Sequence, residues 1–329
     1  MKKTIIYTCP YVPSEWIAAH GLRPSRLMMT AAETTHSIGS VEGVCPFVQS
    51  FVNEALTNQQ ACGVIMTTVC DQMRRGFDIV CRGNTPAFLM NVPNTWQHPD
   101  VQKLYLEELN RLGRFLTGLG GKTPLNEDLA EIMLEYDSAR RFILAEKGHL
   151  SSRQYSEAIA EFNQDGKSDI EKHTTGKEIL TDGIPLAIIG GPLLREDLCL
   201  FDIIEDCGGL IVLDATETGE RGMCAQFDRR RLHEAPLMEL VNAYFGSIPD
   251  ASRRPNNQLY DWFERELASR KVRGIIFRRY VWCDIWHAEL YRLKQWTDLP
   301  VLDIDVSGRG EALSARIIQR IQAFVEMLR

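Results

Sequence analysis

Short apolar runs alternate along the chain with longer segments that have the 3.6-residue period of amphipathic helices. The apolar runs end in Gly, Thr, Cys or Asp, and this alternation is typical of a parallel α/β sheet. The predicted strands form two sets, the first at 4–8, around Leu27 to Thr30, 62–68 and 86–92, and the second at 184–191, 208–214, 272–277 and 299–305. We therefore expect an α/β fold with two parallel-sheet domains.

The segment between the two sets of strands is almost continuously helical in period, from about Val101 to Asn163. A polar, Gly-containing stretch at 164–183 follows it and is the best candidate for a linker. This pattern predicts an N-terminal α/β domain at 1–100, a helical segment and linker at 101–180, and a C-terminal α/β domain at 181–329.

Composition narrows the class of protein. Apolar residues make up 44% of the 329 residues, charged residues 25%, and the net charge is -7, so neither nucleic acid nor a membrane is an expected partner. The apolar run in MKKTIIYTCPYVP is too short for a signal peptide, and no segment approaches the roughly 20 apolar residues of a membrane span. The nine cysteines are then expected to be reduced thiols or metal ligands of a cytoplasmic protein.

Three cysteines share one kind of position, between a predicted strand and a predicted helix. Cys45 precedes Pro46 in GVCPFVQSF, Cys70 ends VIMTTVC, and Cys283 opens CDIWHAELYRL. Because ligands of open parallel sheets bind beyond the carboxyl ends of the strands, we expect these thiols to converge in a cleft between the domains. The positive ends of the helix dipoles are expected to favour the thiolate form.

The spacing of the cysteines leaves the metal open. There is no CxxC pair, so neither a zinc ribbon nor a ferredoxin loop is predicted. Three thiolates could hold a cubane iron–sulfur cluster with one corner free, or zinc together with His287, which is four residues from Cys283. Cys9 is a weaker candidate for a fourth ligand, and the other five cysteines are expected in the core or in loops.

Several segments, taken in order along nearly the whole chain, resemble one known family. They are YVPSEWIAAHGLRPSRL, EGVCPF, TTVCDQMRR, IIGGP, FRRYVWCD and LPVLDIDVSGRGEALSARIIQRIQAFVEML. The chain is similar to the D-component family, subunits of 2-hydroxyacyl-CoA dehydratases and benzoyl-CoA reductases. The resemblance implies two Rossmann-like (flavodoxin-like) domains with a helical part between them. It also implies a [4Fe-4S] cluster in the cleft, held by the cysteines that match the motifs, Cys45, Cys70 and Cys283.

The resemblance further implies an oxygen-sensitive lyase subunit that acts on an acyl-CoA substrate. Such a subunit pairs with a related second subunit, or with its own copy, and receives an electron from an ATP-dependent iron–sulfur activator. The electron makes a ketyl radical that expels the 2-hydroxyl group as water. The alternatives are benzoyl-CoA-type reduction, a double-cubane protein that reduces small molecules, and a non-catalytic electron-transfer or cluster-carrying subunit.

Three residues outside the cysteine set are candidates for catalysis. His36 and Ser37 lie in the polar loop before Cys45, where they could surround a substrate oxygen or the cluster. Glu15, in the YVPSEW segment, could act as an acid or base or could cap a helix. Arginines that could bind CoA phosphates occur at 74–75, 229–231 and 278–279.

Overall fold

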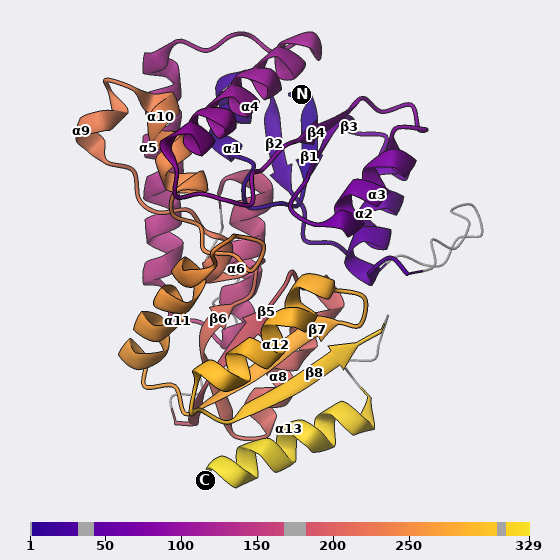
Figure 1. The fold of residues 1–329 in the computed structure, drawn as a ribbon, viewed down its shortest axis with the longest axis vertical. Helices are drawn as coiled ribbons and strands as arrows, with labels where there is room; N and C mark the ends of the chain where they lie inside the picture. The colour runs from indigo at the N-terminus through magenta and orange to yellow at the C-terminus, as the bar shows by residue number, and fades with distance from the viewer. Residues whose placement is uncertain (1, 32–42, 168–181, 308–313) are drawn as a thin grey trace.

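Two four-stranded parallel sheets form the framework of the computed structural model, which describes residues 2–31, 43–167, 182–307 and 314–329 (Figure 1). The first sheet has the order β2-β1-β3-β4, with strands β1 (Thr4–Tyr7), β2 (Arg23–Arg26), β3 (Ala61–Thr67) and β4 (Ala87–Met90). The second has the order β6-β5-β7-β8, with strands β5 (Ile184–Gly190), β6 (Gly209–Ala215), β7 (Gly274–Tyr280) and β8 (Val301–Val306). The two sheets share one strand order, so the predicted pair of Rossmann-like α/β units is confirmed.

One predicted strand is misplaced. The strand expected around Leu27 to Thr30 is β2, Arg23–Arg26, which has the polar sequence RPSR and lies at the edge of its sheet, where a proline is tolerated. Of the apolar residues that follow β2, Met28 packs into the core of the second sheet, whereas Leu27 and Met29 pack in a core cluster with residues of β1 and β3. The apolar run therefore marks contacts with two parts of the core and not a strand.

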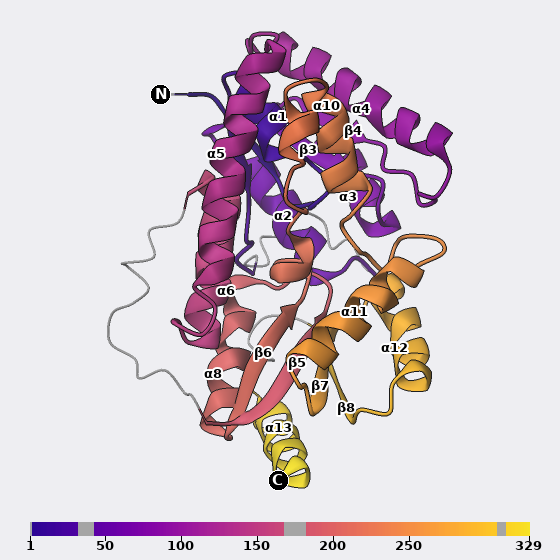
Figure 2. The ribbon, with the colours of Figure 1, turned by 90° about the vertical axis from the view of Figure 1, so that its left-hand side faces the viewer.

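The predicted helical segment between the sheets consists of α4 (Pro99–Gly118), α5 (Asn126–Ala145) and α6 (Ser152–Asp165). Helix α6 packs against β2 of the first sheet and against α8 and β6 of the second, so it joins the two halves (Figure 2).

No helix in the described ranges is long and apolar enough to cross a membrane. The remaining helices are α1 (Ser14–Ala19), α2 (Pro46–Thr57), α3 (Asp71–Val80), η1 (Arg195–Leu198), α8 (Cys199–Asp206), η2 (Glu220–Gly222), α9 (Arg229–Leu232), α10 (Pro236–Leu240), η3 (Val241–Phe245), α11 (Asn257–Ser269), α12 (Asp284–Trp296) and α13 (Ala315–Leu328).

The chain returns to the first sheet after it has begun the second. In the segment coloured orange in Figure 1, helix α10 packs against α5, the short helix η3 packs against α4, and α9 packs against α10. Leu240 and Phe245 from this segment are fully buried in the same core as Ile5 and Tyr105. The core of the first sheet is thus built from two distant parts of the chain, and the domain bounds at residues 100 and 180 remain a prediction.

A buried hydrogen-bond network around Glu15 ties the returning segment to the first half. Glu15 of α1 is fully buried, and its two carboxylate oxygens accept hydrogen bonds from Arg140 Nη2 at 2.7 Å and from the Tyr244 hydroxyl at 2.6 Å. Arg140 also pairs with Asp137 at 3.2 Å. One guanidinium group therefore compensates two buried carboxylates, and its loss would leave both without a counter-charge.

We predict that Arg140→Ala lowers the free energy of unfolding by about 3–5 kcal/mol, the usual cost of leaving buried charges unpaired. Urea unfolding followed by circular dichroism measures this change. Arg141→Ala is the matched control, because Arg141 is the next residue on α5 and is exposed. Equal stabilities of the two variants would contradict the structural role of the pair.

Candidate functional site

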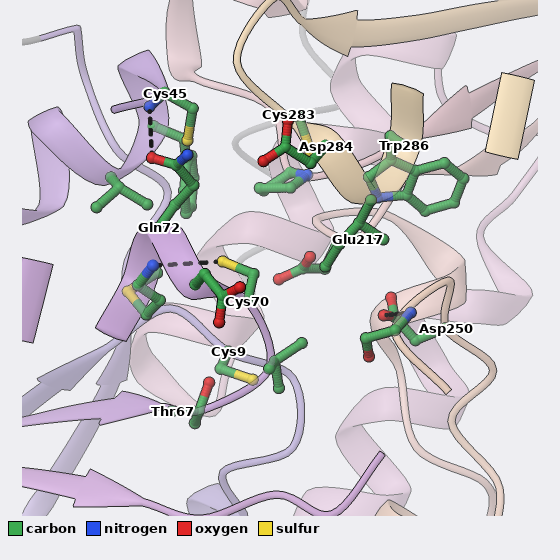
Figure 3. A pocket seen from close by; sticks show the side chains of 18 of the residues that line it. Cys9, Cys45, Thr67, Cys70, Gln72, Glu217, Asp250, Cys283, Asp284 and Trp286 are labelled. Atoms are coloured by element: carbon green, nitrogen blue, oxygen red, sulfur yellow. Dashed lines mark hydrogen bonds between the residues drawn. The ribbon is translucent and has the colours of Figure 1, made fainter. Parts of the chain in front are cut away.

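A cavity of about 440 Å³ opens where the carboxyl ends of the strands of both sheets meet. Residues that follow β1, β3, β5, β6 and β7 all line it. Figure 3 shows Cys9, Cys45 and Cys70 on the side of the first sheet, and Cys283, Glu217, Asp250 and Trp286 on the side of the second. This is the location at which doubly wound sheets bind their ligands.

The three cysteines of the predicted set all line this cavity, and each is the residue immediately before a helix. Cys45 precedes α2, Cys70 precedes α3 and Cys283 precedes α12. The Cys70 sulfur accepts the backbone N–H of Met73 at 3.4 Å, as an N-cap side chain does. The backbone N–H of Cys45 donates to Gln72 Oε1 at 3.3 Å, which links the starts of α2 and α3. Parallel strand direction thus brings together thiols that are far apart in sequence.

The helix starts favour the thiolate form of these cysteines, as expected, but in the protein without a bound metal desolvation outweighs this effect. Burial raises the pKa of Cys45 well above its usual value, that of Cys70 to about 12 and that of Cys283 to about 11. Backbone N–H groups at the helix starts act in the opposite direction but do not compensate for desolvation. The positive charge of a bound metal centre would be needed to ionise these three side chains at neutral pH.

Three thiols are donors that suit either an iron–sulfur cluster or a zinc ion. A tetrahedral zinc site needs its ligand atoms about 2.0–2.3 Å from one ion, so they crowd together. Within the described ranges, no group of three His, Cys, Asp or Glu side chains could hold a metal ion. His287 is exposed on α12 and does not line the cavity. The three thiols that line the cavity are donors of the kind that an iron–sulfur cluster takes.

A family model described as 2-hydroxyglutaryl-CoA dehydratase, D-component, matches residues 9–328, nearly the whole chain. The chain belongs to the 2-hydroxyglutaryl-CoA dehydratase D-component family. The resemblance noted in the sequence is confirmed, and the chain is a component of a dehydratase-type lyase that works with a partner component. Comparison with curated proteins finds no match.

Cys9 is a fourth thiol in the cleft of this D-component family member. It is buried, lines the cavity and lies beside Thr67 (Figure 3). Burial raises the pKa of Cys9 to about 12, and the negative charge of Glu217 acts in the same direction. Its position is compatible with the role of a fourth ligand, which stays a prediction.

The structure describes one of the three candidate catalytic residues, Glu15. Glu15 lies outside the cavity, and both its oxygens are taken up by Arg140 and Tyr244. The helix-capping role considered for Glu15 is also absent, because α1 has no side-chain cap. His36 and Ser37 lie outside the described residues.

The arginines considered for CoA phosphates have different surroundings. Arg278 is buried and donates to Asp197 at 2.5 Å, so its guanidinium group is part of a buried ion pair in the second half. The arginines at 229–231 lie on α9 and do not line the cavity. Arg74 lies at the cavity with half of its side chain exposed. Of the described candidates, Arg74 is therefore the one that could contact a ligand there.

Two acidic residues of the cleft were missed by sequence reasoning. Burial raises the pKa of Glu217 to about 7, and the negative charge of Asp250 acts in the same direction. The positive charges of Arg221 and Arg26 act to lower this pKa. Burial alone would also raise the pKa of Asp250, but Arg221 and the Ser252 groups lower it below its usual value. The position of Glu217 just after β6 is the signal that could have identified it, since such positions face the ligand edge of a parallel sheet.

A buried arginine holds the acidic wall in place. Arg221 donates to Asp250 at 2.6 Å and to the carbonyl oxygens of Gly190 and Pro249 at 2.9 and 3.0 Å. Its guanidinium carbon also lies 4.8 Å from the centroid of the Trp286 ring, which lines the cavity. Arg221 thus joins the end of β5, the loop before α11 and the start of α12.

We predict that metal-free, folded protein reacts with iodoacetamide at Cys81 about tenfold or more faster than at Cys45, because Cys81 is exposed and Cys45 is buried with a raised pKa. Mass spectrometry of peptides after timed labelling measures both rates. Cys224, which is buried away from the cleft, is the control and is expected to react as slowly as Cys45. Equal rates at Cys81 and Cys45 would contradict the burial of the cleft thiols.

Proposed function

We propose that this chain is the iron–sulfur subunit of a 2-hydroxyacyl-CoA dehydratase, with a [4Fe-4S] cluster held by Cys45, Cys70 and Cys283. The observation that carries the proposal is the arrangement of three thiols at three helix starts around one cavity. Three thiolates leave one corner of a cubane without a protein ligand, and that corner is the position at which a substrate oxygen could bind. Membership of the D-component family supports the same reading.

The proposed reaction is the removal of water from a 2-hydroxyacyl-CoA. When bound, the cluster would supply low-potential one-electron chemistry to the thioester carbonyl. The electron comes from an ATP-dependent iron–sulfur activator protein and is returned at the end of the turnover. The substrate loses its 2-hydroxyl group and one proton from C3 as water, and an unsaturated acyl-CoA remains.

The residues of this chain contribute the environment for that reaction. The starts of α2, α3 and α12 direct backbone N–H groups toward the sulfur atoms, which favours bound thiolates. The Gln72 oxygen is occupied by the Cys45 N–H, so the Gln72 amide NH₂ is the part left to donate to a ligand in the cavity. Val48, Ile285 and Trp286 supply apolar walls that keep water away.

We predict about four iron and four sulfide per chain after strictly anaerobic purification. Cys70→Ala is expected to lose most of both, because only two thiol ligands would remain. Cys81→Ala, which removes an exposed cysteine at the opposite end of α3, is the control and is expected to keep the wild-type content.

Other results would change the proposal in defined ways. Roughly eight iron per chain would favour a double-cubane protein that reduces small molecules. One zinc and no sulfide would replace the cluster by a cysteine-rich zinc site. Full cluster content in Cys70→Ala would refute the ligand set.

A second prediction separates a catalytic subunit from an electron-transfer subunit. In the catalytic case, adding a 2-hydroxyacyl-CoA to the anaerobic protein changes the electron paramagnetic resonance spectrum of the reduced sample, because the substrate approaches the open corner. Free CoA is the control, since it lacks the acyl group. An unchanged spectrum, in protein that still accepts and gives up electrons, would favour the non-catalytic alternative.

A further inference from the structure

The main chain of Glu217 is held from both sides at the edge of the cleft. Its carbonyl oxygen accepts Arg26 Nη2 at 2.7 Å, and its N–H donates to the Gly191 carbonyl at 3.3 Å. The loop then turns back so closely that a Cβ atom on Gly222 would lie 1.9 Å from the Glu217 carbonyl oxygen. The backbone position of Glu217 is therefore set by contacts with both halves of the molecule.

The side chain of Glu217, in contrast, has no hydrogen bond or ion pair with any part of the chain that the structure describes. Figure 3 shows its carboxylate pointing into the cavity, on the side of Cys70. A partly buried carboxyl group without a protein partner carries a desolvation cost that a ligand hydrogen bond would offset. The geometry is that of a group kept free for a ligand.

The other acids of the cavity are engaged or lie at its exposed rim. Asp250 accepts hydrogen bonds from Arg221 Nη1 at 2.6 Å and from the Ser252 N–H at 2.8 Å. Asp71 pairs with Arg74 and is almost fully exposed, and Asp284 is also exposed. Among the acidic residues described in the lining, Glu217 is thus the one that combines partial burial with a free carboxyl group.

The charges around Glu217 restrict what can bind beside it. A carboxylate or phosphate group would be repelled by the Glu217 carboxylate itself, and the negative charge of Asp250, which Arg221 compensates in part, adds to this repulsion. A neutral hydroxyl group is suitable, because it can donate to the Glu217 carboxylate or accept from its protonated form. A hydrogen bond to a charged group contributes more than one between neutral groups.

We propose that Glu217 is a specificity-determining residue that hydrogen-bonds the 2-hydroxyl group of the acyl-CoA substrate. The inference rests on the proposed function for the class of substrate, but it concerns recognition of the hydroxyl group and not the electron chemistry. Glu217 would select 2-hydroxyacyl thioesters over thioesters that lack the hydroxyl group, because its carboxyl would otherwise remain buried without a partner.

The test compares the binding of two probes that differ by this single group, lactoyl-CoA and propionyl-CoA. Isothermal titration calorimetry on the anaerobically purified full chain, with any co-purifying subunit, gives the ratio of their dissociation constants. The wild-type protein is expected to prefer lactoyl-CoA by roughly 10- to 100-fold, the range of a hydrogen bond to a charged group. Glu217→Leu is expected to reduce this ratio to about one, mainly by weakening lactoyl-CoA binding.

Two further variants keep the test decisive. Glu217→Gln is closer in shape and retains a neutral hydrogen-bonding group, so its ratio is expected to fall between those of the wild type and Glu217→Leu. Glu264→Leu removes an exposed carboxylate of α11 outside the cavity and is expected to keep the wild-type ratio. Iron and sulfide content, measured for each variant, shows whether the cavity is otherwise intact.

The outcomes separate the inference from the function on which it rests. A wild-type ratio that is unchanged in both Glu217 variants would overturn the role of Glu217 and leave the proposed function standing. Equal binding of the two thioesters by the wild type would likewise overturn the inference. Failure of the wild type to bind either thioester would overturn the proposed function and the inference together.

Discussion

Parallel strand direction is the constraint on which the structure of the cleft depends. Within each sheet the carboxyl ends of the strands lie at one edge, and the cavity is lined from these ends in both sheets. Each of Cys45, Cys70 and Cys283 then needs only to precede a helix in order to face the same space. The parallel topology thereby brings three cysteines that are far apart in sequence to the same cavity.

Buried arginines fix the wall of the cleft. Arg26 of the first sheet donates to the Glu217 carbonyl of the second half, and Arg221 connects Gly190, Pro249 and Asp250 within the second half. Such buried guanidinium groups need several well-placed acceptors to offset their desolvation, so they tolerate little rearrangement. The cavity wall is consequently rigid around Glu217 while the carboxyl group of this residue remains free.

Desolvation is the main electrostatic effect in the cleft. It raises the pKa values of the thiols and of Glu217, in spite of nearby helix starts and arginines. Positive charge brought by a metal centre would reverse this balance for the cysteines, since coordination stabilises the thiolate directly. Metal binding and proton release are therefore expected to be linked at this site.

Sequence pattern alone predicts the α/β class, seven of the eight described strands and the positions of the three cysteines before helices, because these depend on local periodicity and on strand direction. Tertiary structure decided what local pattern does not encode. Met28, which follows the polar strand β2, is buried in the core of the second sheet, and Glu15 pairs with Arg140, which lies 125 residues away. Glu217 is placed at the cavity by contacts with Arg26 and Gly191, and such long-range contacts leave no periodic signal in the sequence.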